Sequence, residues 1–426
     1  MNYSDSVKYL LSLGNEVSAM KLGLDNVRKL LTALGDPQNN YIKVQVAGTN
    51  GKGSVCAFLD SICNSSGIKT GTFTSPHLVS MTERIRINGS DISEEDFARH
   101  ATLVRETAEN LLAKGALEYR PTFFEQITAI ALVAFSESKV ELAILETGLG
   151  GRLDATTATN AEIAAITRID LDHQEYLGNT IEDIAAEKAA IIQAGSTVVI
   201  GEQDLEPKKV IDARLDRFGI VAGMAERVTT TCGSGWLKFA TEKAEYEVTE
   251  LGLKGQHQIE NAKVVIRLVE ILQGRFGITS ENIIVGLANA RHPGRLEYLG
   301  QYLFDGAHNI GGATALATYL REFEPRPITL VFGAMRGKDV QDIASILWPL
   351  AKSIVLTQPD NSRSMRAVEL AKMAPLNVDR GRITLTESVG EALKKAEKLA
   401  DANAIIMITG SLYLVGEAKG ILKSQI

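Results

Sequence analysis

The stretch Val46-Ala47-Gly48-Thr49-Asn50-Gly51-Lys52-Gly53-Ser54 decides the fold of the first part of this chain. A short apolar run, Tyr41 to Val46, precedes it, and an amphipathic segment, Val55 to Asn64, follows it. Strand, glycine-rich loop and helix in this order present backbone N–H groups and a helix N-terminus to an anion. The side chain of Lys52 adds a positive charge, and Ser54 adds a hydroxyl that can reach Mg²⁺. The stretch therefore predicts a site for the phosphates of a nucleoside triphosphate.

The strict phosphate-loop pattern, G-x-x-x-x-G-K-[ST], is not met here. Val46 occupies the position of the first glycine, and Gly53 separates Lys52 from Ser54. A glycine-rich turn that binds nothing is the alternative interpretation. The strand before the loop, the helix after it and the dipeptide 49–50 favour phosphate binding.

Composition bounds the class of protein. A chain of 426 residues is too long for one ordinary core, and its 45% hydrophobic and 23% charged residues are typical of globular proteins. The modest net charge of −7 and the scattered aromatic residues argue against nucleic-acid binding. Three cysteines without C-x-x-C spacing (Cys56, Cys63 and Cys232) predict neither a disulfide framework nor a zinc site. No apolar run approaches the roughly 20 residues that span a bilayer, and the first residues lack a signal-peptide pattern, so we expect a cytoplasmic protein without membrane contacts.

Short apolar runs alternate with segments of helical periodicity, which indicates an α/β fold with a mostly parallel sheet. The strands expected first are Ile42–Val46, Lys69–Phe73, Glu141–Leu145, Glu162–Thr167 and Thr197–Ile200, followed by a hairpin of Trp236–Ala240 and Ala244–Val248. The helices expected among them include Glu94–Leu112, Phe123–Ser136, Ile181–Ile192 and Gln256–Leu272. Proline and glycine within 291–295 interrupt this pattern, so we expect one domain over 1–290 and a smaller one over 291–426.

A new α/β series follows this interruption. Its expected strands are Leu299–Phe304, Ile328–Phe332, Ser353–Leu356 and Ala404–Ile408. Its expected helices are Gly312–Glu322, Val340–Leu350, Ser388–Leu399 and Leu412–Lys423. The expected architecture is an N-terminal ATP-binding domain with a parallel sheet and a C-terminal Rossmann-like domain.

Polar residues follow several of these strands. Glu146 and the loop 147–154 follow one strand, and the segment Thr167 to His173 follows another. Ligands of open parallel sheets gather at the carboxyl ends of strands, so we expect Glu146 and His173 near the phosphate loop. A carboxylate at that edge can hold Mg²⁺. A solvated turn is the alternative for each, and Lys188 would be a solvated helix residue on spacing alone.

In the second half, the segment Phe304 to Asn309 places Asp305 and His308 where a strand turns into a helix. Arg295 precedes that strand and could reach a phosphate. One domain with a phosphate loop and another with a carboxylate and an imidazole suggest a reaction in the cleft between them.

With these motifs in order, the chain resembles the folylpolyglutamate synthase and dihydrofolate synthase family of the Mur ligase superfamily. The motifs are Gly-Thr-Asn-Gly-Lys-Gly-Ser (48–54), Thr-Ser-Pro-His-Leu (74–78), Glu-Arg-Ile-Arg-Ile-Asn-Gly (83–89), Phe-Phe-Glu (123–125), Gly-Leu-Gly-Gly-Arg-Leu-Asp-Ala-Thr (148–156), Leu-Asp-His (171–173), Leu-Gly-Asn-Thr (177–180), Ile-Ala-Ala-Glu-Lys (184–188), Gly-Gln-His-Gln (255–258), His-Pro-Gly-Arg-Leu-Glu (292–297), Phe-Asp-Gly-Ala-His-Asn (304–309) and Gly-Ser-Leu-Tyr-Leu-Val-Gly (410–416). Each motif is weak alone, and the ordered set is specific. The extra glycine of the Gly-Lys-Gly-Ser form resembles the folate branch more than the cell-wall branch.

The resemblance implies an ATP-dependent ligase that joins L-glutamate to dihydropteroate, to reduced folates or to both through an acyl phosphate. The implied cofactors are ATP and two Mg²⁺ ions, and the implied partners are small molecules only, bound by a monomer. The residues implied in catalysis are Lys52, Lys188, His173, Asp305 and His308.

The resemblance also implies the site residues by position. ATP would contact Gly48, Thr49, Asn50, Gly51, Lys52, Gly53, Ser54, Asn261, Arg295 and Asp305. The metal ligands would be Ser54, Glu146, His173 and Lys188, the last as a carbamate. The folate would contact Ser75, His77, Arg84, Phe123, Phe124 and Asp154. Glutamate would lie near His308 and Ser411.

Two positions depart from the family pattern: Ala190 replaces a glycine and Ile310 replaces a proline. We expect little effect from the first, because a helix is predicted there, and a looser helix start from the second.

Three other functions remain open at this level. A nucleotide-dependent switch or kinase would share only the phosphate loop and would not need Asp305, His308 or glutamate. A binding module that has lost catalysis is disfavoured by the intact Lys52, Glu146 and Lys188. Within the ligase class, the alternative is a Mur-type enzyme that acts on a UDP-linked acceptor.

Overall fold

The computed structural model describes residues 1–14 and 23–423, and these residues form two compact units. The first unit comprises 1–77, 81–252 and 260–291; the second comprises 78–80, 253–259 and 292–426. The last residue of the first unit is Arg291, next to the boundary at 290/291 expected from the sequence. The segments 78–80 and 253–259, which belong to the second unit, were not part of that expectation.

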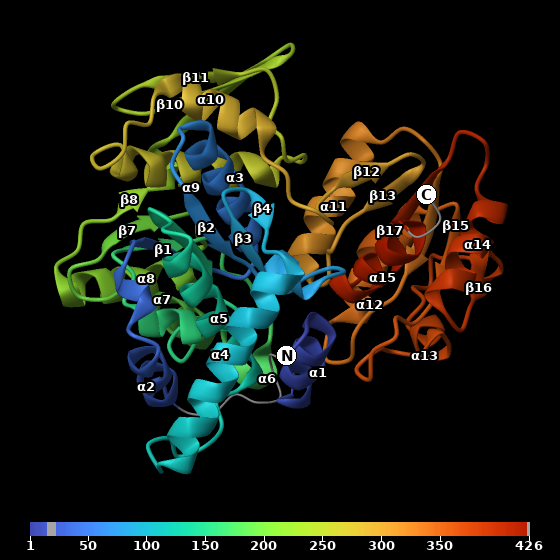
Figure 1. The fold of residues 1–426 in the computed structure, drawn as a ribbon. Coiled ribbons are helices and arrows are strands. Elements are labelled where there is room, and N and C mark those ends of the chain that lie inside the picture. Colours follow the sequence, from blue (N-terminus) through green and yellow to red (C-terminus); the bar gives the residue numbers. More distant parts are fainter. Residues whose placement is uncertain (15–22, 424–426) are drawn as a thin grey trace. The chain divides into compact units, whose positions relative to one another are not determined.

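An eight-stranded sheet organises the first unit, in the order β4-β3-β2-β5-β1-β6-β7-β8 (Figure 1). The run from β2 to β8 is parallel, while β3 and β4 join antiparallel at one edge. The bounds are β1 Ile42–Ala47, β2 Thr70–Phe73, β3 Ile85–Ile87, β4 Ser90–Asp91, β5 Leu142–Glu146, β6 Ile163–Ile166, β7 Thr197–Ile200 and β8 Gly223–Met224. The central strands are buried along nearly their whole length, which matches their continuous apolar sequence.

Helices complete this unit around the sheet. They are α1 Tyr3–Ser12, α2 Asp25–Ala33, α3 Lys52–Ser65, α4 Glu94–Ala113, α5 Phe123–Glu137, α6 Gln174–Leu177, α7 Ile181–Ala189, α8 Leu205–Phe218, α9 His257–Leu272 and α10 Ser280–Asn289, with 3₁₀ turns η1 Pro37–Asn39, η2 Met81–Arg84, η3 Ala155–Thr159 and η4 Ala225–Arg227. One apolar core lies beneath α1, α2, α4 and α5, and a second beneath α6, α7 and α8. Gly286 of α10 lies against Ile62 of α3, where a β-carbon would come within 2.4 Å of the Ile62 Cα.

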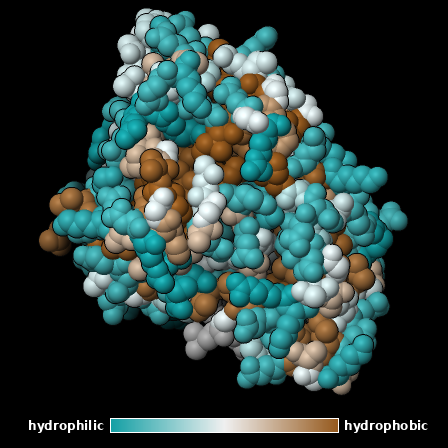
Figure 2. Space-filling view, turned by 90° about the vertical axis from the view of Figure 1, so that its left-hand side faces the viewer, coloured by the Kyte–Doolittle hydropathy of each residue, from teal (hydrophilic) through white to brown (hydrophobic). Residues whose placement is uncertain are grey.

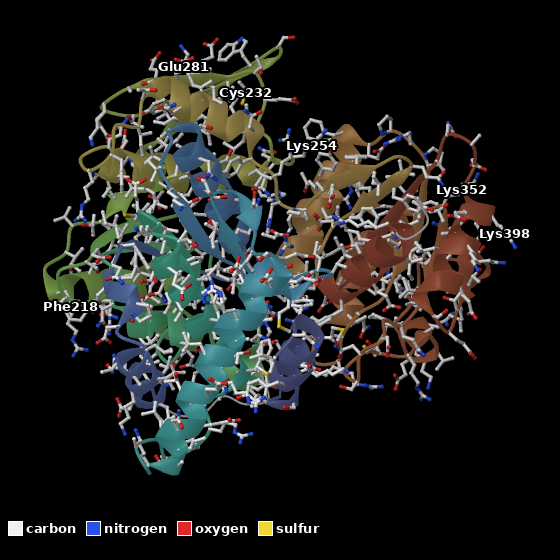
Figure 3. All side chains as sticks on the ribbon, viewed as in Figure 1. Phe218, Cys232, Lys254, Glu281, Lys352 and Lys398 are labelled. Carbon is white, nitrogen blue, oxygen red and sulfur yellow. The ribbon has the colours of Figure 1, made fainter. Side chains whose placement is uncertain are left out.

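A separate antiparallel sheet stands beside these helices. It consists of β9 Thr229–Gly233, β10 Trp236–Ala240 and β11 Glu245–Val248, in the order β11-β10-β9. The predicted hairpin is confirmed, and β9 adds a third strand to it. Cys232 is exposed on this sheet (Figure 3), whereas Cys56 and Cys63 are buried in α3.

The second unit is built on a six-stranded sheet, in the order β12-β13-β17-β14-β15-β16. Its strands are β12 Glu297–Leu299, β13 Tyr302–Phe304, β14 Ile328–Phe332, β15 Ser353–Leu356, β16 Ile383–Leu385 and β17 Ile405–Thr409. Its helices are α11 Ile310–Phe323, α12 Val340–Leu347, α13 Ala367–Lys372, α14 Val389–Leu399 and α15 Leu412–Lys423, with 3₁₀ turns η5 Trp348–Leu350 and η6 Arg380–Arg382. All neighbouring strands except β12 and β13 run parallel, so the expected α/β architecture is confirmed for both units.

One strand prediction was wrong. The single strand expected over Leu299–Phe304 is instead the turn and second half of a hairpin, because Gly300 adopts φ +58° and reverses the chain between β12 and β13. The expected helix over Val340–Leu350 also ends three residues early, where Pro349 enters a 3₁₀ turn.

The surface face drawn in Figure 2 is largely hydrophilic, with hydrophobic side chains gathered in separate patches. Across residues 1–14 and 23–423, no helix combines the length and apolar character needed to cross a membrane.

Candidate active site

The carboxyl ends of β5, β1 and β6 lie side by side in the first unit. Strand β1 pairs with β5 so that Val46 is opposite Glu146, and with β6 so that Ala47 is opposite Ile166. The phosphate loop after β1 therefore shares one edge of the sheet with Glu146 and with the segment that begins at Thr167. The expectation that these sequence-distant residues meet at one edge is confirmed.

The phosphate loop itself depends on two glycines with positive φ. At Gly48 (φ +152°), a β-carbon would lie 1.9 Å from the Thr167 hydroxyl oxygen. Gly51 (φ +93°) caps helix α3, and a β-carbon there would lie 2.2 Å from the side-chain oxygen of Asn261. Because α3 begins at Lys52, the N-terminus of this helix, where an α-helix carries its positive pole, lies at the end of the loop.

The segment after β6 holds the phosphate loop in place. The backbone N–H groups of Thr49 and Asn50 both donate to the Arg168 carbonyl, at 2.8 and 3.2 Å. The Asn50 amide donates to the Asp170 carboxylate at 2.8 Å, and the Thr49 hydroxyl donates to the Asp170 carbonyl at 2.9 Å. These bonds of Thr49 and Asn50 hold the loop against the segment after β6.

Two lysines converge on one carbonyl of this loop. The ammonium of Lys52 donates to the Gly48 carbonyl at 3.0 Å, and that of Lys188 donates to the same oxygen at 2.9 Å. Lys188 is only 5% exposed. Burial, reinforced by the charge of Lys52, lowers the pKa of Lys188 to about 7, although Asp172, Asp154 and Glu187 oppose the shift. The solvated role that spacing alone suggested for Lys188 does not hold, because tertiary packing brings α7 against the loop.

The candidate metal ligands are presented from three elements. Ser54 lies in the first turn of α3, and Glu146 ends β5; both are buried, at 5% and 6% exposure. One Glu146 oxygen accepts from the Ser75 N–H at 3.1 Å. His173 follows β6 with φ +52° and lies 3.9 Å from the Asp172 carboxylate through its Nε2.

This donor set fits a hard divalent cation. A hydroxyl and a carboxylate held beside a phosphate loop offer the oxygen ligands that Mg²⁺ prefers. Within the described residues, no group of three or more His, Cys, Asp and Glu side chains is arranged to hold a metal by itself. An additional ligand would therefore have to come from another source, such as the bound nucleotide or a modified Lys188.

The residues expected to contact folate gather around the segment 75–84. His77 accepts a hydrogen bond at Nδ1 from the Arg84 Nε, at 2.7 Å. The Arg84 guanidinium lies over the ring of Phe123, 5.3 Å from its centroid. Phe124 packs against Phe73 with ring centroids 5.8 Å apart, and its ring would be 2.5 Å from a β-carbon at Gly148. Phe123 is 2% exposed and belongs to the core, whereas Phe124 is partly exposed.

Asp154, also expected to contact folate, is hydrogen-bonded within its own loop. One of its oxygens accepts from the N–H groups of Gly148 and Leu149, at 2.9 and 3.0 Å. The other accepts from the N–H and the hydroxyl of Thr156, at 3.0 and 2.6 Å. In this structure, four donors of its own loop bond to this buried carboxylate. These bonds hold the glycine-rich loop that follows Glu146 in its observed conformation.

In the second unit, the segment after β13 is also held by hydrogen bonds to backbone groups. The Asp305 carboxylate accepts from the N–H groups of Leu296 and Ala307, at 3.0 and 2.9 Å. Burial raises the pKa of Asp305, against the opposing effect of Arg295 and these two donors. His308 donates from Nδ1 to the Gly306 carbonyl at 2.8 Å. The Ser411 hydroxyl oxygen accepts from the Leu414 N–H at 3.1 Å, in the first turn of α15.

The two departures from the family pattern have simple local outcomes. Ala190 is the C-cap residue directly after α7, with φ −64°, a value open to any residue. Helix α11 begins at Ile310, where the Asn309 side chain accepts from the Gly312 N–H at 2.8 Å. This cap provides the helix start that a proline would otherwise favour.

Sequence reasoning missed the residues that hold the loops. Asp170 is the main example, because its carboxylate, carbonyl and N–H all contact the phosphate loop. The signal was present as two acids beside His173, yet which acid contacts the loop depends on pairing between β1 and β6.

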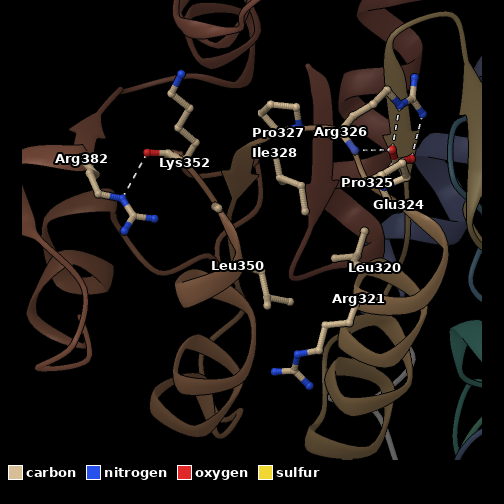
Figure 4. A pocket seen from close by; sticks show the side chains of 11 residues that line it. Leu320, Arg321, Glu324, Pro325, Arg326, Pro327, Ile328, Leu350, Lys352 and Arg382 are labelled. Carbon is tan, nitrogen blue, oxygen red and sulfur yellow. Dashed lines mark hydrogen bonds and ion pairs between the residues drawn. The ribbon is translucent and has the colours of Figure 1, made fainter. Parts of the chain in front are cut away.

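A pocket of about 610 Å³ lies elsewhere in the second unit (Figure 4). It is at the amino ends of β14 and β15, opposite the edge that carries Asp305. Arg326 is paired with Glu324 at 2.7 Å, and the Arg382 Nε donates to the Lys352 carbonyl at 3.1 Å. We assign this pocket no role. Its arginines 326 and 382 already form hydrogen bonds within the protein, and the negative pole of helix α11 lies at the pocket, which disfavours an anion there.

Comparison with known proteins decides the family. Residues 46–269 match the Mur ligase middle domain, and residues 294–412 match the Mur ligase, glutamate ligase domain. The chain is 34% identical over 421 residues to a dihydrofolate synthase/folylpolyglutamate synthase of Bacillus subtilis, covering 95% of this chain and 96% of that protein. The chain belongs to the folylpolyglutamate synthase/dihydrofolate synthase family of Mur ligases.

Another relative and two solved structures are also similar to this chain. A probable bifunctional folylpolyglutamate synthase/dihydropteroate synthase of Halobacterium salinarum is 34% identical, and the chain spans about half of its length (51%). Among solved structures, a Mycobacterium tuberculosis folylpolyglutamate synthase complexed with ADP matches with TM-score 0.91 and 31% identity over 99% of both chains. A Yersinia pestis bifunctional folylpolyglutamate synthase/dihydrofolate synthase complexed with AMPPNP and a Mn ion matches with TM-score 0.85 and 26% identity, over 99% of this chain and 98% of that one.

Proposed function

We propose that this Mur-family protein is an ATP-dependent ligase that joins L-glutamate to dihydropteroate, to reduced folates or to both. The observation that carries the proposal is the shared sheet edge of the first unit. A phosphate loop, the buried Glu146 and the buried Lys188 meet there, on a chain that matches both Mur ligase domains. The ADP and AMPPNP complexes of its structural relatives support a nucleotide at this loop.

The phosphates of ATP are bound by the N-terminus of α3 in this proposal. The hydrogen bonds of Asn50 and Thr49 with the segment after β6 keep the loop in shape. Lys52 exchanges its contact with the Gly48 carbonyl for the transferring phosphate. This exchange is favourable because it replaces a neutral carbonyl by an anion.

Mg²⁺ would be held by Ser54 and Glu146, and when bound it would neutralise negative charge on the phosphates. His173 is proposed as a ligand of a second ion. The Mn ion of the Yersinia relative supports a divalent cation in this family.

We further propose that Lys188 becomes a carbamate. Carbamylation needs a neutral amine, and a pKa near 7 provides one at neutral pH. The nitrogen lone pair attacks CO₂, the new N–C bond forms, and the amine proton leaves to solvent. The product is anionic, so the repulsion between Lys188 and Lys52 becomes an attraction. Activity in CO₂-depleted buffer should fall and return with bicarbonate; equal activity in both buffers would rule the carbamate out.

The acceptor carboxylate attacks the γ-phosphorus of ATP, and ADP leaves. The amino group of L-glutamate then attacks the acyl carbon, loses a proton and expels phosphate. The chain's contribution is positioning and charge neutralisation.

The folate is proposed to contact Phe124, His77 and the remainder of 75–84, with aromatic stacking on the flat heterocycle. In the second unit, Arg295 and Asp305 are proposed to contact the nucleotide, and His308 and Ser411 the glutamate, in a monomeric cytoplasmic enzyme.

Oxygen-18 tests this chemistry directly. When the acceptor carboxylate is labelled, an acyl phosphate requires that one labelled oxygen appear in the released phosphate for each amide formed. Phosphate without label would contradict the acyl phosphate. A matched reaction without glutamate controls for spontaneous exchange.

A further inference from the structure

One contact in the candidate folate site has a consequence for proton placement. The Arg84 guanidinium donates from Nε to Nδ1 of His77, with 2.7 Å between the two nitrogens. An arginine side chain carries donors only and stays protonated in proteins. The His77 Nδ1 must therefore be the acceptor, which means that it carries no proton.

The environment of the pair keeps the ring neutral. A second proton on Nδ1 would place two cations in contact and displace the Arg84 hydrogen bond. Burial of the ring and the charge of Arg84 both lower the pKa of His77, to about 3. The single ring proton is consequently on Nε2.

Arg84 is well placed to fix this arrangement. Its side chain is 3% exposed and its guanidinium lies over the Phe123 ring, which is part of the core. The helix that begins with Phe123 is itself fixed by a capping box between Thr122 and Glu125. The imidazole is partly exposed, and among the described residues we find no partner for its Nε2.

We propose that Arg84 is a positioning residue that locks His77 as the neutral Nε2–H tautomer, so that His77 offers the substrate a hydrogen-bond donor and neither a cation nor an acceptor. The complementary group is a neutral acceptor on the heterocycle, such as a carbonyl oxygen or a ring nitrogen lone pair. The substrate half of this inference rests on the proposed function, whereas the tautomer does not.

The tautomer is tested without any assay of activity. Protein labelled with nitrogen-15 histidine is examined by long-range proton–nitrogen correlation at neutral pH, and His77→Gln assigns the His77 signals among the six histidines. We expect one protonated nitrogen, Nε2, and one unprotonated nitrogen, Nδ1. A protonated Nδ1 in the unmodified protein, in either the neutral or the charged ring, would overturn the proposal.

Substitution of the arginine tests the cause. Arg84→Met removes the donor and one of the two causes of the low pKa, so His77 should sample both neutral tautomers, and its pKa should rise while burial still holds it below the ordinary value. Arg105→Met is the matched control, because Arg105 also lies 5.3 Å from an aromatic centroid, that of Tyr9, and does not contact His77. If Arg84→Met unfolds the protein, the tautomer of the unmodified protein still decides the proposal.

Kinetics test the substrate half. A glutamine at position 77 can place an amide donor near the Nε2 site, whereas the shorter asparagine cannot. His77→Asn should therefore raise KM for the pteroyl substrate roughly three- to tenfold, the size of one neutral hydrogen bond, with KM for ATP unchanged. His77→Gln should recover most of this loss. Equal pteroyl KM values for His77→Asn and the unmodified enzyme would overturn the donor role. An enzyme that glutamylates no pteroyl compound would instead overturn the proposed function and leave the tautomer result standing.

Discussion

At the scale of single residues, Lys188 shows how far burial changes the chemistry of a side chain. Its pKa is lowered from 10.5 to about 7, chiefly because its charged form loses hydration. At a pH between these two pKa values, the lysine is protonated in the unfolded state and neutral in the folded state. The unfolded state then binds more protons, so stability rises with pH across this window.

A pH series on Lys188→Met tests this linkage. In CO₂-depleted buffer, the free energy of unfolding of the unmodified protein should gain up to about 1.4 kcal/mol per pH unit above pH 7 from this residue. The methionine variant should lack that contribution, so the difference between the two proteins should change steadily from about pH 7.5 to about pH 9.5. Urea denaturation measures it, and a constant difference across the series would contradict the buried neutral lysine.

Gly51 is the second residue whose surroundings dictate its identity. Its φ of +93° disfavours any side chain, and a β-carbon would displace the Asn261 amide. Gly51→Ala should lose about 1–2 kcal/mol of stability from the left-handed backbone and weaken ATP binding about tenfold or more, because the loop shifts.

Gly115→Ala is the matched control for this change. Gly115 also has a positive φ, +66°, but no atom lies within 4 Å of the β-carbon position. It should lose similar stability and keep its ATP affinity, as measured by titration calorimetry. Equal ATP affinities for the two variants would contradict the contact between Asn261 and the loop.

At the scale of elements, helix α15 packs against the segment 78–80, which belongs to the same unit. Gly416 leaves room for the backbone of Leu78, whose carbonyl oxygen would lie 2.0 Å from a β-carbon. Four residues later, Gly420 has only an ordinary contact, at 3.9 Å from Val79. The two glycines therefore form a matched pair on one helix.

Alanine at each position should act in opposite directions. Gly420→Ala should stabilise the protein by up to about 1 kcal/mol, since alanine favours a helix. Gly416→Ala should lower Tm, because the Leu78 backbone cannot yield as a flexible side chain would. Thermal denaturation of both variants gives the comparison, and a rise in Tm for Gly416→Ala would show that Leu78 does not pack on α15.

The elements also show what sequence can predict. Continuous apolar runs such as Thr197–Ile200 and Ile328–Phe332 became strands with those bounds, because burial on both faces leaves no other pattern. The hairpin of β12 and β13 was missed because only Gly300 and Gln301, within a largely apolar run, mark the turn.

For the candidate site, the sequence predicted which residues lie close together and not which hydrogen bonds they form. Strand ends bring Glu146 and the phosphate loop together, so their proximity followed from the order of the motifs. The separate roles of Asp154 and Asp170 did not follow, because a carboxylate's role depends on which donors converge on it. Asp170 meets donors about 120 positions away in the chain, and only the pairing of β1 with β6 reveals them.

At the scale of the whole molecule, two α/β units carry the residues of one proposed reaction. The first offers a phosphate loop with Glu146 and Lys188, and the second offers Asp305 and His308 after β13. A kinase or switch that used only the loop would have no need of the second set or of glutamate. Glutamate dependence is therefore the property that separates the proposed ligase from these alternatives.

The most direct test is mass spectrometry of reactions with MgATP, L-glutamate and either dihydropteroate or tetrahydrofolate in separate tubes. The account predicts that at least one acceptor gains a glutamyl unit, with one ATP converted to ADP for each amide formed. Product from dihydropteroate alone would define a dihydrofolate synthase, from tetrahydrofolate alone a polyglutamylating enzyme, and from both the bifunctional form. ATP hydrolysis with no glutamyl gain on either acceptor would contradict the account.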